Sequence, residues 1–219
     1  AAMKRPVTLP PPPPVKDGRW RSPVEIDPFS VSLDDKVTLL LAANAEALAR
    51  YAALCQEAGI VPIVEPEVLM DGDHDIERGE EVTDAALETV FDALFLHRVR
   101  LEGMVLKPNM VIPGKGNADQ ASPERIAQAT LDCFRRHVPA AVPGIAFLSG
   151  GQNDEEATAH LDAMNRIGNL PWKLTFSYGR ALQAAPQKAW SGRAENLAAA
   201  QRAFNHRAMM NGLASLGQW

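Results

Sequence analysis

The chain has 219 residues, of which 46% are hydrophobic and 22% charged, and its formal net charge is −5. This composition is typical of a globular protein, and the acidic balance excludes the concentrated basic face of a nucleic-acid-binding domain. No run approaches the roughly 20 consecutive apolar residues of a membrane span, and the N-terminus lacks the apolar core of a secretory signal. We therefore expect a cytoplasmic protein whose partners include neither a membrane nor a nucleic acid.

Residues 1–33 differ from the rest and predict a proline-rich leader that is largely disordered. Five consecutive prolines, Pro10–Pro14, exclude a helix or a central strand and favour an exposed polyproline II segment. Such a run is more often a linker than a ligand for an SH3-type domain. We expect residues 34–219 to form the folded part.

After residue 33, helical and strand patterns alternate. The expected helices are residues 33–58, a helix that opens at Thr83, one that begins after Ser122 and ends before Pro139, one capped by Asn153, and residues 194–215. The expected strands are residues 60–64, 103–106, 145–148 and 174–177. Four strand–helix units in series predict an α/β fold with a parallel sheet, and four units are half of a (β/α)8 TIM barrel. Within these helices, Cys55 and Cys133 are expected to be free thiols rather than a disulfide.

Reactive side chains follow each expected strand. In a parallel α/β fold, such groups meet at the carboxyl ends of the strands. In chain order they are Glu65 and Glu67, then Lys107, then Ser149 and Gly150, then Ser177, Gly179 and Arg180.

Lys107 is the most informative of these residues. It follows an apolar run, which disfavours the charged ammonium, and a neutral amine can attack a carbonyl carbon. Glu65 and Glu67 lie two residues apart and would point to the same face of an extended strand. A carboxylic acid there suits the loss of water that completes a Schiff base. The alternative is a lysine that reaches into solvent beside two solvated glutamates.

Two glycine-containing turns predict an anion site. Barrels often bind phosphate through backbone N–H groups in the loops after their last two strands, and Arg180 would add a charge-assisted contact. The alternative is two ordinary turns and a surface arginine.

The acidic segment Asp71-Gly72-Asp73-His74-Asp75 resembles a metal-binding loop only at first sight. An EF-hand requires glycine at its sixth position and glutamate at its twelfth, where this chain has Ile76 and Val82. His74 has no second histidine at ligand spacing. A solvated loop is favoured, and we expect no metal.

Several long segments closely resemble class I fructose-bisphosphate aldolases. They are IVPIVEPEVL at 60–69, GDHD at 72–75, LKPNMV at 106–111, FLSGGQ at 147–152, LTFSYGRALQ at 174–183, KAW at 188–190 and NGLASLGQ at 211–218. The resemblance runs from about Asn44 to Trp219, roughly four-fifths of the chain.

The resemblance implies reversible cleavage of fructose 1,6-bisphosphate to dihydroxyacetone phosphate and glyceraldehyde 3-phosphate, in glycolysis or gluconeogenesis. The enzyme would be a lyase, free of metal and cofactor, and usually a homotetramer. Lys107 would be the Schiff-base lysine, Glu65 the proton-transfer glutamate and Glu67 the second acid beside it. The matching positions that hold a substrate phosphate are Ser149, Gly150, Ser177, Gly179 and Arg180.

The chain also departs from the family. The family's first three barrel strands are not matched, and Arg19-Trp20-Arg21 is the nearest match to its Lys-Trp-Arg strand. We therefore expect a truncated aldolase in which Schiff-base chemistry is possible and full turnover is weak. Two alternatives stay open: an inactive aldolase-derived binding protein, and a different Schiff-base lyase.

Overall fold

A computed structural model of the chain describes residues 33–219. Residues 41–219 form one compact unit. The expected leader, its Pro10–Pro14 run and Arg19-Trp20-Arg21 lie outside the described residues.

Helix α1 (Leu33–Glu57) is rich in alanine, the residue with the highest helix propensity. Ala45, Ala49 and Ala52 follow one another at steps of four and three, and all three are buried. The apolar spacing therefore predicted this helix correctly.

The segment Val37–Glu57 of α1 is long and apolar enough to cross a membrane by length and composition alone, with a mean hydropathy of 1.2. We expected no such segment from the sequence, because no run of strictly apolar residues is long enough. A single helix of this kind is weak evidence, since core helices of globular proteins meet the same test.

The sheet has four described strands in the order β1-β2-β3-β4, and each neighbouring pair is parallel. The strands are β1 (Ile63–Val64), β2 (Val105–Leu106), β3 (Gly144–Phe147) and β4 (Lys173–Phe176). Val64 pairs with Leu106, and Phe147 pairs with Phe176. Spatial order equal to chain order is what successive βα units of a barrel produce, and the predicted partial TIM barrel is confirmed.

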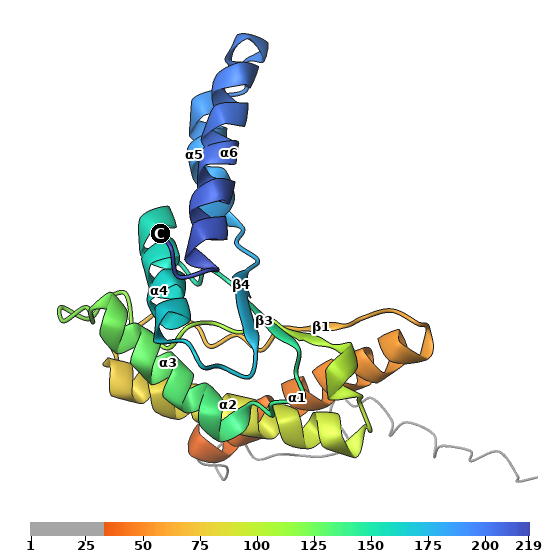
Figure 1. Cartoon of the computed structure of the whole chain (residues 1–219). Helices are drawn as coiled ribbons and strands as arrows, with labels where there is room; N and C mark the ends of the chain where they lie inside the picture. Colours follow the sequence, from red (N-terminus) through yellow and green to blue (C-terminus); the bar gives the residue numbers. More distant parts are fainter. Residues whose placement is uncertain (1–32) are drawn as a thin grey trace, which may run out of the picture. The chain divides into compact units, whose positions relative to one another are not determined.

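Helices α2 (Ile76–Leu96) and α3 (Pro123–His137) lie side by side on one face of the sheet, and α4 (Asp154–Ile167) packs next to α3 (Figure 1). The predicted caps of α3 and α4 are confirmed. Ser122 accepts from Arg125 N, with Pro123 in the first turn. Asn153 and Glu156 form a capping box at the start of α4.

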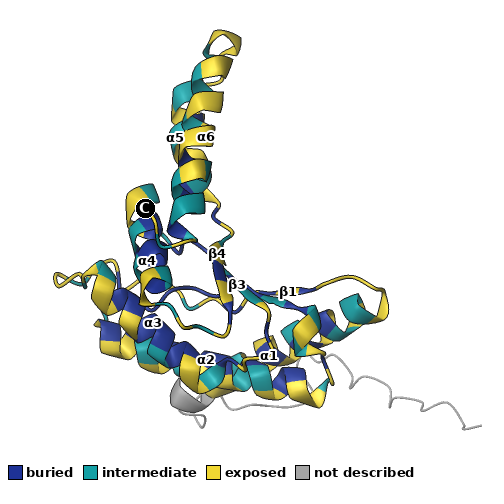
Figure 2. Ribbon diagram, viewed as in Figure 1, coloured by how far each residue is buried: buried dark blue, intermediate teal, exposed yellow. Residues whose placement is uncertain are grey.

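The last two helices, α5 (Arg180–Trp190) and α6 (Leu197–Ala214), form a pair that extends away from the sheet (Figure 1). Most of this pair is exposed or half-buried (Figure 2). Its base packs on α4, where Asn211 Oδ1 accepts a hydrogen bond from Thr158 Oγ1 at 2.7 Å. Arg207 donates to Asp154 O and to Thr158 Oγ1. These buried polar contacts hold α6 to the beginning of α4.

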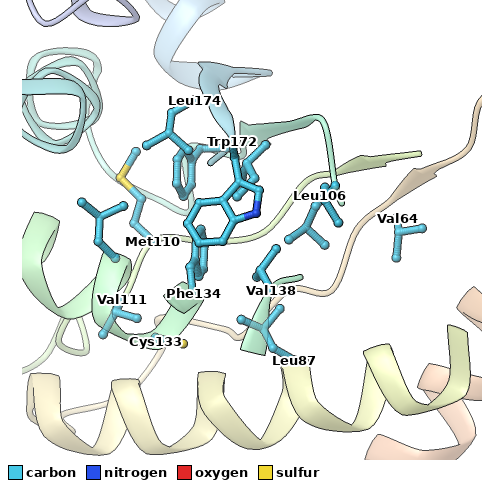
Figure 3. Close-up of a cluster of buried hydrophobic side chains, with 14 of the residues drawn as sticks. Val64, Leu87, Leu106, Met110, Val111, Cys133, Phe134, Val138, Trp172 and Leu174 are labelled. Atoms are coloured by element: carbon cyan, nitrogen blue, oxygen red, sulfur yellow. The ribbon is translucent and has the colours of Figure 1, made fainter. Parts of the chain in front are cut away.

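The core lies between the sheet and the helices α2 and α3 (Figure 3). Phe134 of α3 stacks on Phe147 of β3 with ring centroids 5.6 Å apart, and Trp172 meets Phe134 edge-on at 6.4 Å. Cys133 is buried here as a free thiol, and burial raises its pKa. Cys55 is also free, as predicted.

The start of α2 was predicted wrongly. The helix begins at Ile76, and its cap is Asp75, whose Oδ1 accepts from Arg78 N. Thr83, the predicted first residue, is buried in the middle of the helix and donates its hydroxyl to Gly79 O. A threonine can bond to the carbonyl four residues earlier inside a helix as readily as it can cap one, and the sequence alone did not separate the two.

Other boundaries also differ from the prediction: β1 is shorter than the expected 60–64, and β3 and β4 each begin and end one residue earlier than expected. Residues Leu101–Gly103 form a short 3-10 helix, η1, so that β2 starts only at Val105. Ala194–Asn196 form a second one, η2, before α6. Helix α5, which contains Pro186, was not predicted; it packs against α6.

Candidate functional site

Backbone bonds continue past the strand ends and keep the predicted site residues in register. Lys107 N donates to Val64 O at 2.8 Å, and Ser177 N donates to Phe147 O at 2.8 Å. Leu148 N donates to Pro108 O at 3.1 Å. The four carboxyl ends therefore form one continuous edge, with the residues after β1 beside those after β2, and so on to β4.

Lys107 and Glu65 meet at this edge. Lys107 Nζ lies 2.8 Å from Glu65 Oε1, and the side chains are 20% and 44% exposed, so both remain open to a ligand. Glu67 is also exposed, whereas Pro66 between the two glutamates is buried. The alternation confirms that both carboxylates leave the same face of the chain. Their catalytic roles stay predictions.

The side chain of Asn109 connects the segment after β1 with the segment after β2. It is buried, its Oδ1 accepts from Val68 N at 2.9 Å, and its Nδ2 donates to Met110 O at 3.1 Å. This amide fixes the chain after Glu65 and Glu67 relative to the chain after Lys107. It positions the pair without touching it.

A cavity of about 480 Å³ opens beside Glu65 and Glu67. Its remaining walls are mostly apolar, apart from Asn44, and come mainly from α1 and α2, including Leu48, Tyr51 and Val90. Lys107 does not line it. The cavity therefore lies between the glutamates and the helices α1 and α2, away from Lys107. We do not assign the substrate to it.

The residues after β3 form a tight turn. Gly150 has φ +48° and Gly151 has φ +73°, left-handed conformations that glycine adopts without steric cost. Ser149 is buried, and its carbonyl accepts from both the backbone and the side-chain amide of Gln152. The turn is therefore held from its inner side by Gln152.

Gln152 is itself held by a buried histidine of α4. His160 Nδ1 contacts Gln152 Oε1. Burial lowers the pKa of His160 to about 4, although Glu156 and Glu124 act in the opposite direction. The imidazole is therefore neutral near pH 7. Because Oε1 can only accept, the neutral ring donates its Nδ1–H to it, and this fixes the amide orientation of Gln152.

The residues after β4 present polar groups next to this turn. Ser177, Gly179 and Arg180 are exposed, and Gly179 is the cap residue of α5. Tyr178 points the other way: it is buried, and its hydroxyl donates to Ala157 O at 2.7 Å. Burial raises the pKa of Tyr178 above its ordinary value, so this hydroxyl keeps its proton. The predicted anion-site residues are thus brought to neighbouring strand ends.

The acidic segment 71–75 serves the fold. Asp75 caps α2, the carbonyl of Gly72 accepts from Gly116 N at 2.7 Å, and that of His74 accepts from Gly114 N at 2.9 Å. Among the side chains of residues 37–219, no group of three or more histidine, cysteine or acidic residues could hold a metal ion.

One residue of this edge was missed from the sequence. Lys115 lies in the loop after β2, and its ammonium rests against Gly151. The only local signal is that it stands between two glycines, Gly114 and Gly116. Nothing in that pattern indicates that a loop 36 residues further on is its neighbour.

A parallel α/β sheet with a lysine–carboxylate pair at its carboxyl edge defines the chain as a barrel-type protein with a site suited to amine chemistry. The family model for class I fructose-bisphosphate aldolases matches residues 15–219. The chain belongs to this family. The match includes residues 15–33, which we expected to belong to the leader.

Similar proteins come from distant organisms. A probable class 1 fructose-bisphosphate aldolase of Xanthomonas campestris is 54% identical over 202 residues, which cover 92% of this chain and 59% of that protein. Fructose-bisphosphate aldolase 2 of Caenorhabditis elegans is 59% identical over 177 residues, covering 80% and 48%. Fructose-bisphosphate aldolase C of Rattus norvegicus is 52% identical over 209 residues, covering 93% and 56%. The chain thus spans between about half and three-fifths of the length of these relatives.

A solved structure has the same fold. It is fructose-bisphosphate aldolase from Plasmodium falciparum, in a ternary complex with TRAP and a small-molecule inhibitor. The TM-score is 0.81 at 47% sequence identity, and the match covers 83% of this chain and 52% of that one.

Proposed function

We propose that the chain carries the Schiff-base part of a fructose-bisphosphate aldolase site, with Lys107 as the nucleophile. The observation that supports this most is the 2.8 Å contact between Lys107 Nζ and Glu65 Oε1 at the edge of the sheet. The proposed reaction is the reversible cleavage of fructose 1,6-bisphosphate to dihydroxyacetone phosphate and glyceraldehyde 3-phosphate, which makes the chain a lyase.

The first step requires an unprotonated amine. Transfer of one proton from Lys107 Nζ to Glu65 Oε1 yields a neutral amine and a carboxylic acid in the same place. The amine attacks the ketone carbon of the sugar, and one of its two remaining protons moves to the former carbonyl oxygen. Glu65 then protonates the resulting hydroxyl, which leaves as water. The products are a protonated imine on Lys107 and a carboxylate on Glu65.

The imine carbon is C2 of the sugar. Cleavage then breaks the bond between C3 and C4. The electron pair of that bond moves toward the imine, which becomes an enamine. At the same time the hydroxyl on C4 loses its proton, and C4 becomes the aldehyde carbon. Glu65, returned to the carboxylate, is a base near this position, and Glu67 is a second carboxylate at the same strand end. Protonation of the enamine and addition of water release the ketone product and free Lys107.

A phosphate close to the ketone would lie along the edge toward β4. The groups we assign to it are Ser149, Gly150, Ser177, Gly179 and Arg180. Backbone N–H groups at the start of α5 favour an anion through the helix dipole, and Arg180 adds a full positive charge. The strand order supports this assignment, because β3 is the neighbour of β2 and β4 follows one strand further on.

Other features of the proposal come from the family alone. We propose that the reaction needs no metal or cofactor, that the protein acts in the cytoplasm in glycolysis or gluconeogenesis, and that it assembles as a homotetramer. The alternative, an inactive binding protein, would recruit partners through open sheet edges or through Pro10–Pro14, and the latter lie outside the described residues.

Borohydride trapping tests the proposal. The chain is incubated with dihydroxyacetone phosphate, reduced, and examined by intact mass and peptide mapping. We expect one reduced adduct on Lys107 and none in Lys107→Arg. A sample that is folded by circular dichroism and forms no adduct would overturn the proposal, and an adduct with other keto sugars only would favour a different Schiff-base lyase.

A further inference from the structure

The turn after β3 presents three backbone donors with nothing to bind. The N–H groups of Ser149, Gly150 and Gly151 have no hydrogen-bond acceptor among the residues that the structure describes. Ser149 and Gly150 are buried, and Gly151 is half-buried. Buried backbone N–H groups are almost always paired, so three successive free donors indicate a place for an external acceptor. Successive N–H groups in a left-handed turn are a recurring way to hold an anion.

A positive charge stands against the same turn. The exposed end of the Lys115 side chain, Cε and Nζ, occupies the space that a Cβ atom would take on Gly151. The φ of +73° at Gly151 favours glycine there, and a larger side chain would displace the end of the lysine. The backbone of the lysine is fixed as well, because Lys115 N donates to Met70 O at 2.9 Å.

The charge of Lys115 is not neutralised within the protein. Asp71 and Asp73 lie in the adjacent loop, yet neither forms an ion pair with it, and no other carboxylate of residues 37–219 does so. Arg125 and Arg136, by contrast, each bind acidic residues of α2. A lysine ammonium without a partner beside unpaired N–H groups is complementary to an anion with several acceptor oxygens.

We propose that Lys115 is a further contact residue for the substrate phosphate, acting together with the N–H groups of residues 149–151. The inference rests on the proposed function for the identity of the ligand, a phosphate monoester, and adds a charge from the loop after β2. Three consecutive βα loops then contribute to one subsite: β2 supplies Lys115, β3 the glycine turn and β4 Arg180. Gly151 serves the site by admitting the lysine.

The test measures phosphate binding separately from Schiff-base chemistry. Inorganic phosphate is titrated into the ¹⁵N-labelled full chain, and the amide shifts of Gly150 and Gly151 give the dissociation constant. We expect Lys115→Gln to weaken binding about tenfold, the effect of removing one charge-assisted contact. Lys115→Arg should retain most of the affinity because it keeps the charge.

Lys173→Gln is the matched control. Lys173 is an exposed lysine at the opposite, amino end of β4, so its removal changes the net charge equally but leaves the turn untouched. We expect its affinity for phosphate to stay within about twofold of the parent chain, since an exposed charge far from the turn is screened.

The outcomes separate the two proposals. Equal phosphate affinity in Lys115→Gln and the parent chain, or no shift of Gly150 and Gly151 in the parent chain, overturns the role of Lys115. The chain could also bind phosphate in a way that depends on Lys115 and yet form no adduct on Lys107. That result supports this inference and contradicts only the proposed function. Trapping with dihydroxyacetone, which lacks the phosphate, should be insensitive to Lys115→Gln.

Discussion

Lys107 and Glu65 are separated by 42 positions in the chain, and their contact exists because β1 and β2 are neighbours in the sheet. In the resting pair, Lys107 Nζ lies 2.8 Å from Glu65 Oε1, close enough for direct proton transfer. One proton transfer converts both groups into the forms that Schiff-base formation requires. The chemistry that we propose therefore depends on a single contact between two residues.

Replacing Glu65 by glutamine tests that dependence. Glutamine keeps the size of the side chain but cannot receive or return the proton, so we expect adduct formation on Lys107 to slow by at least about 100-fold. The rate is measured by borohydride trapping at fixed times. Glu88→Gln, a change at an exposed glutamate of α2, is the control and should leave the rate unchanged. Equal trapping rates in the two variants would refute the role of Glu65.

The buried His160 predicts a pH dependence of stability. Its folded pKa of about 4 lies below the ordinary value of 6.5, because burial disfavours the charged ring. As the pH falls from 6.5 toward 4, the unfolded chain binds a proton and the folded chain does not. The stabilisation present above pH 6.5 is therefore lost through this window, by about 3 kcal/mol at most.

Urea unfolding of the parent chain and His160→Asn between pH 7 and pH 4 measures this effect. The free energy of unfolding of the parent chain should fall more steeply, because asparagine does not titrate. Parallel pH profiles for the two proteins would show that the histidine does not contribute in this way.

At the scale of the elements, α2 shows how packing overrides helix propensity. Gly79 lies inside the helix, where glycine is less favourable than alanine by about 1 kcal/mol. A Cβ at this position would lie 2.7 Å from Ile112 O, closer than side chains come to backbone oxygens. The glycine is there because the chain after β2 passes directly over the helix.

Two glycine-to-alanine changes should therefore have opposite signs. We expect Gly79→Ala to destabilise the protein by about 1–3 kcal/mol through overpacking. Gly212→Ala in α6 meets no atom within 4 Å and should stabilise by about 0.5–1 kcal/mol. Chemical unfolding of both variants checks the signs. Stabilisation by Gly79→Ala would mean that the contact with Ile112 relaxes at little cost.

On the scale of the whole compact unit, residues 41–219, one aromatic cluster joins layers that are far apart in sequence. Phe134 from α3 packs on Phe147 from β3 and on Trp172, which precedes β4. The same strands carry the turn of residues 149–151 and the residues after β4. The cluster thus supports the edge on which the candidate anion site lies.

Removal of Phe134 should be costly. A phenylalanine with 0% exposure replaced by alanine leaves a cavity, and we expect a loss of about 3–5 kcal/mol in the free energy of unfolding. Phe95→Ala is the matched change at a side chain that is 82% exposed, and it should alter stability by less than about 0.5 kcal/mol. Thermal or urea unfolding compares the two, and similar losses would contradict the assignment of the core.

Local signals in the sequence determined much of this protein. The caps Ser122 and Asn153 act within one helical turn, and the alanine spacing of α1 repeats over adjacent turns, so both could be predicted without the fold. The four strands in series predicted one parallel sheet, and with it the meeting of Lys107 and Glu65.

Contacts between loops were decided by the tertiary structure alone. The approach of Lys115 to Gly151 and that of Ile112 to Gly79 join segments more than 30 residues apart. Their neighbourhood follows from the sheet order and the path of each loop, which no short pattern encodes. For the same reason the true start of α2 and the existence of α5 across Pro186 could not be predicted: the packing energy that selects them comes from other elements of the fold.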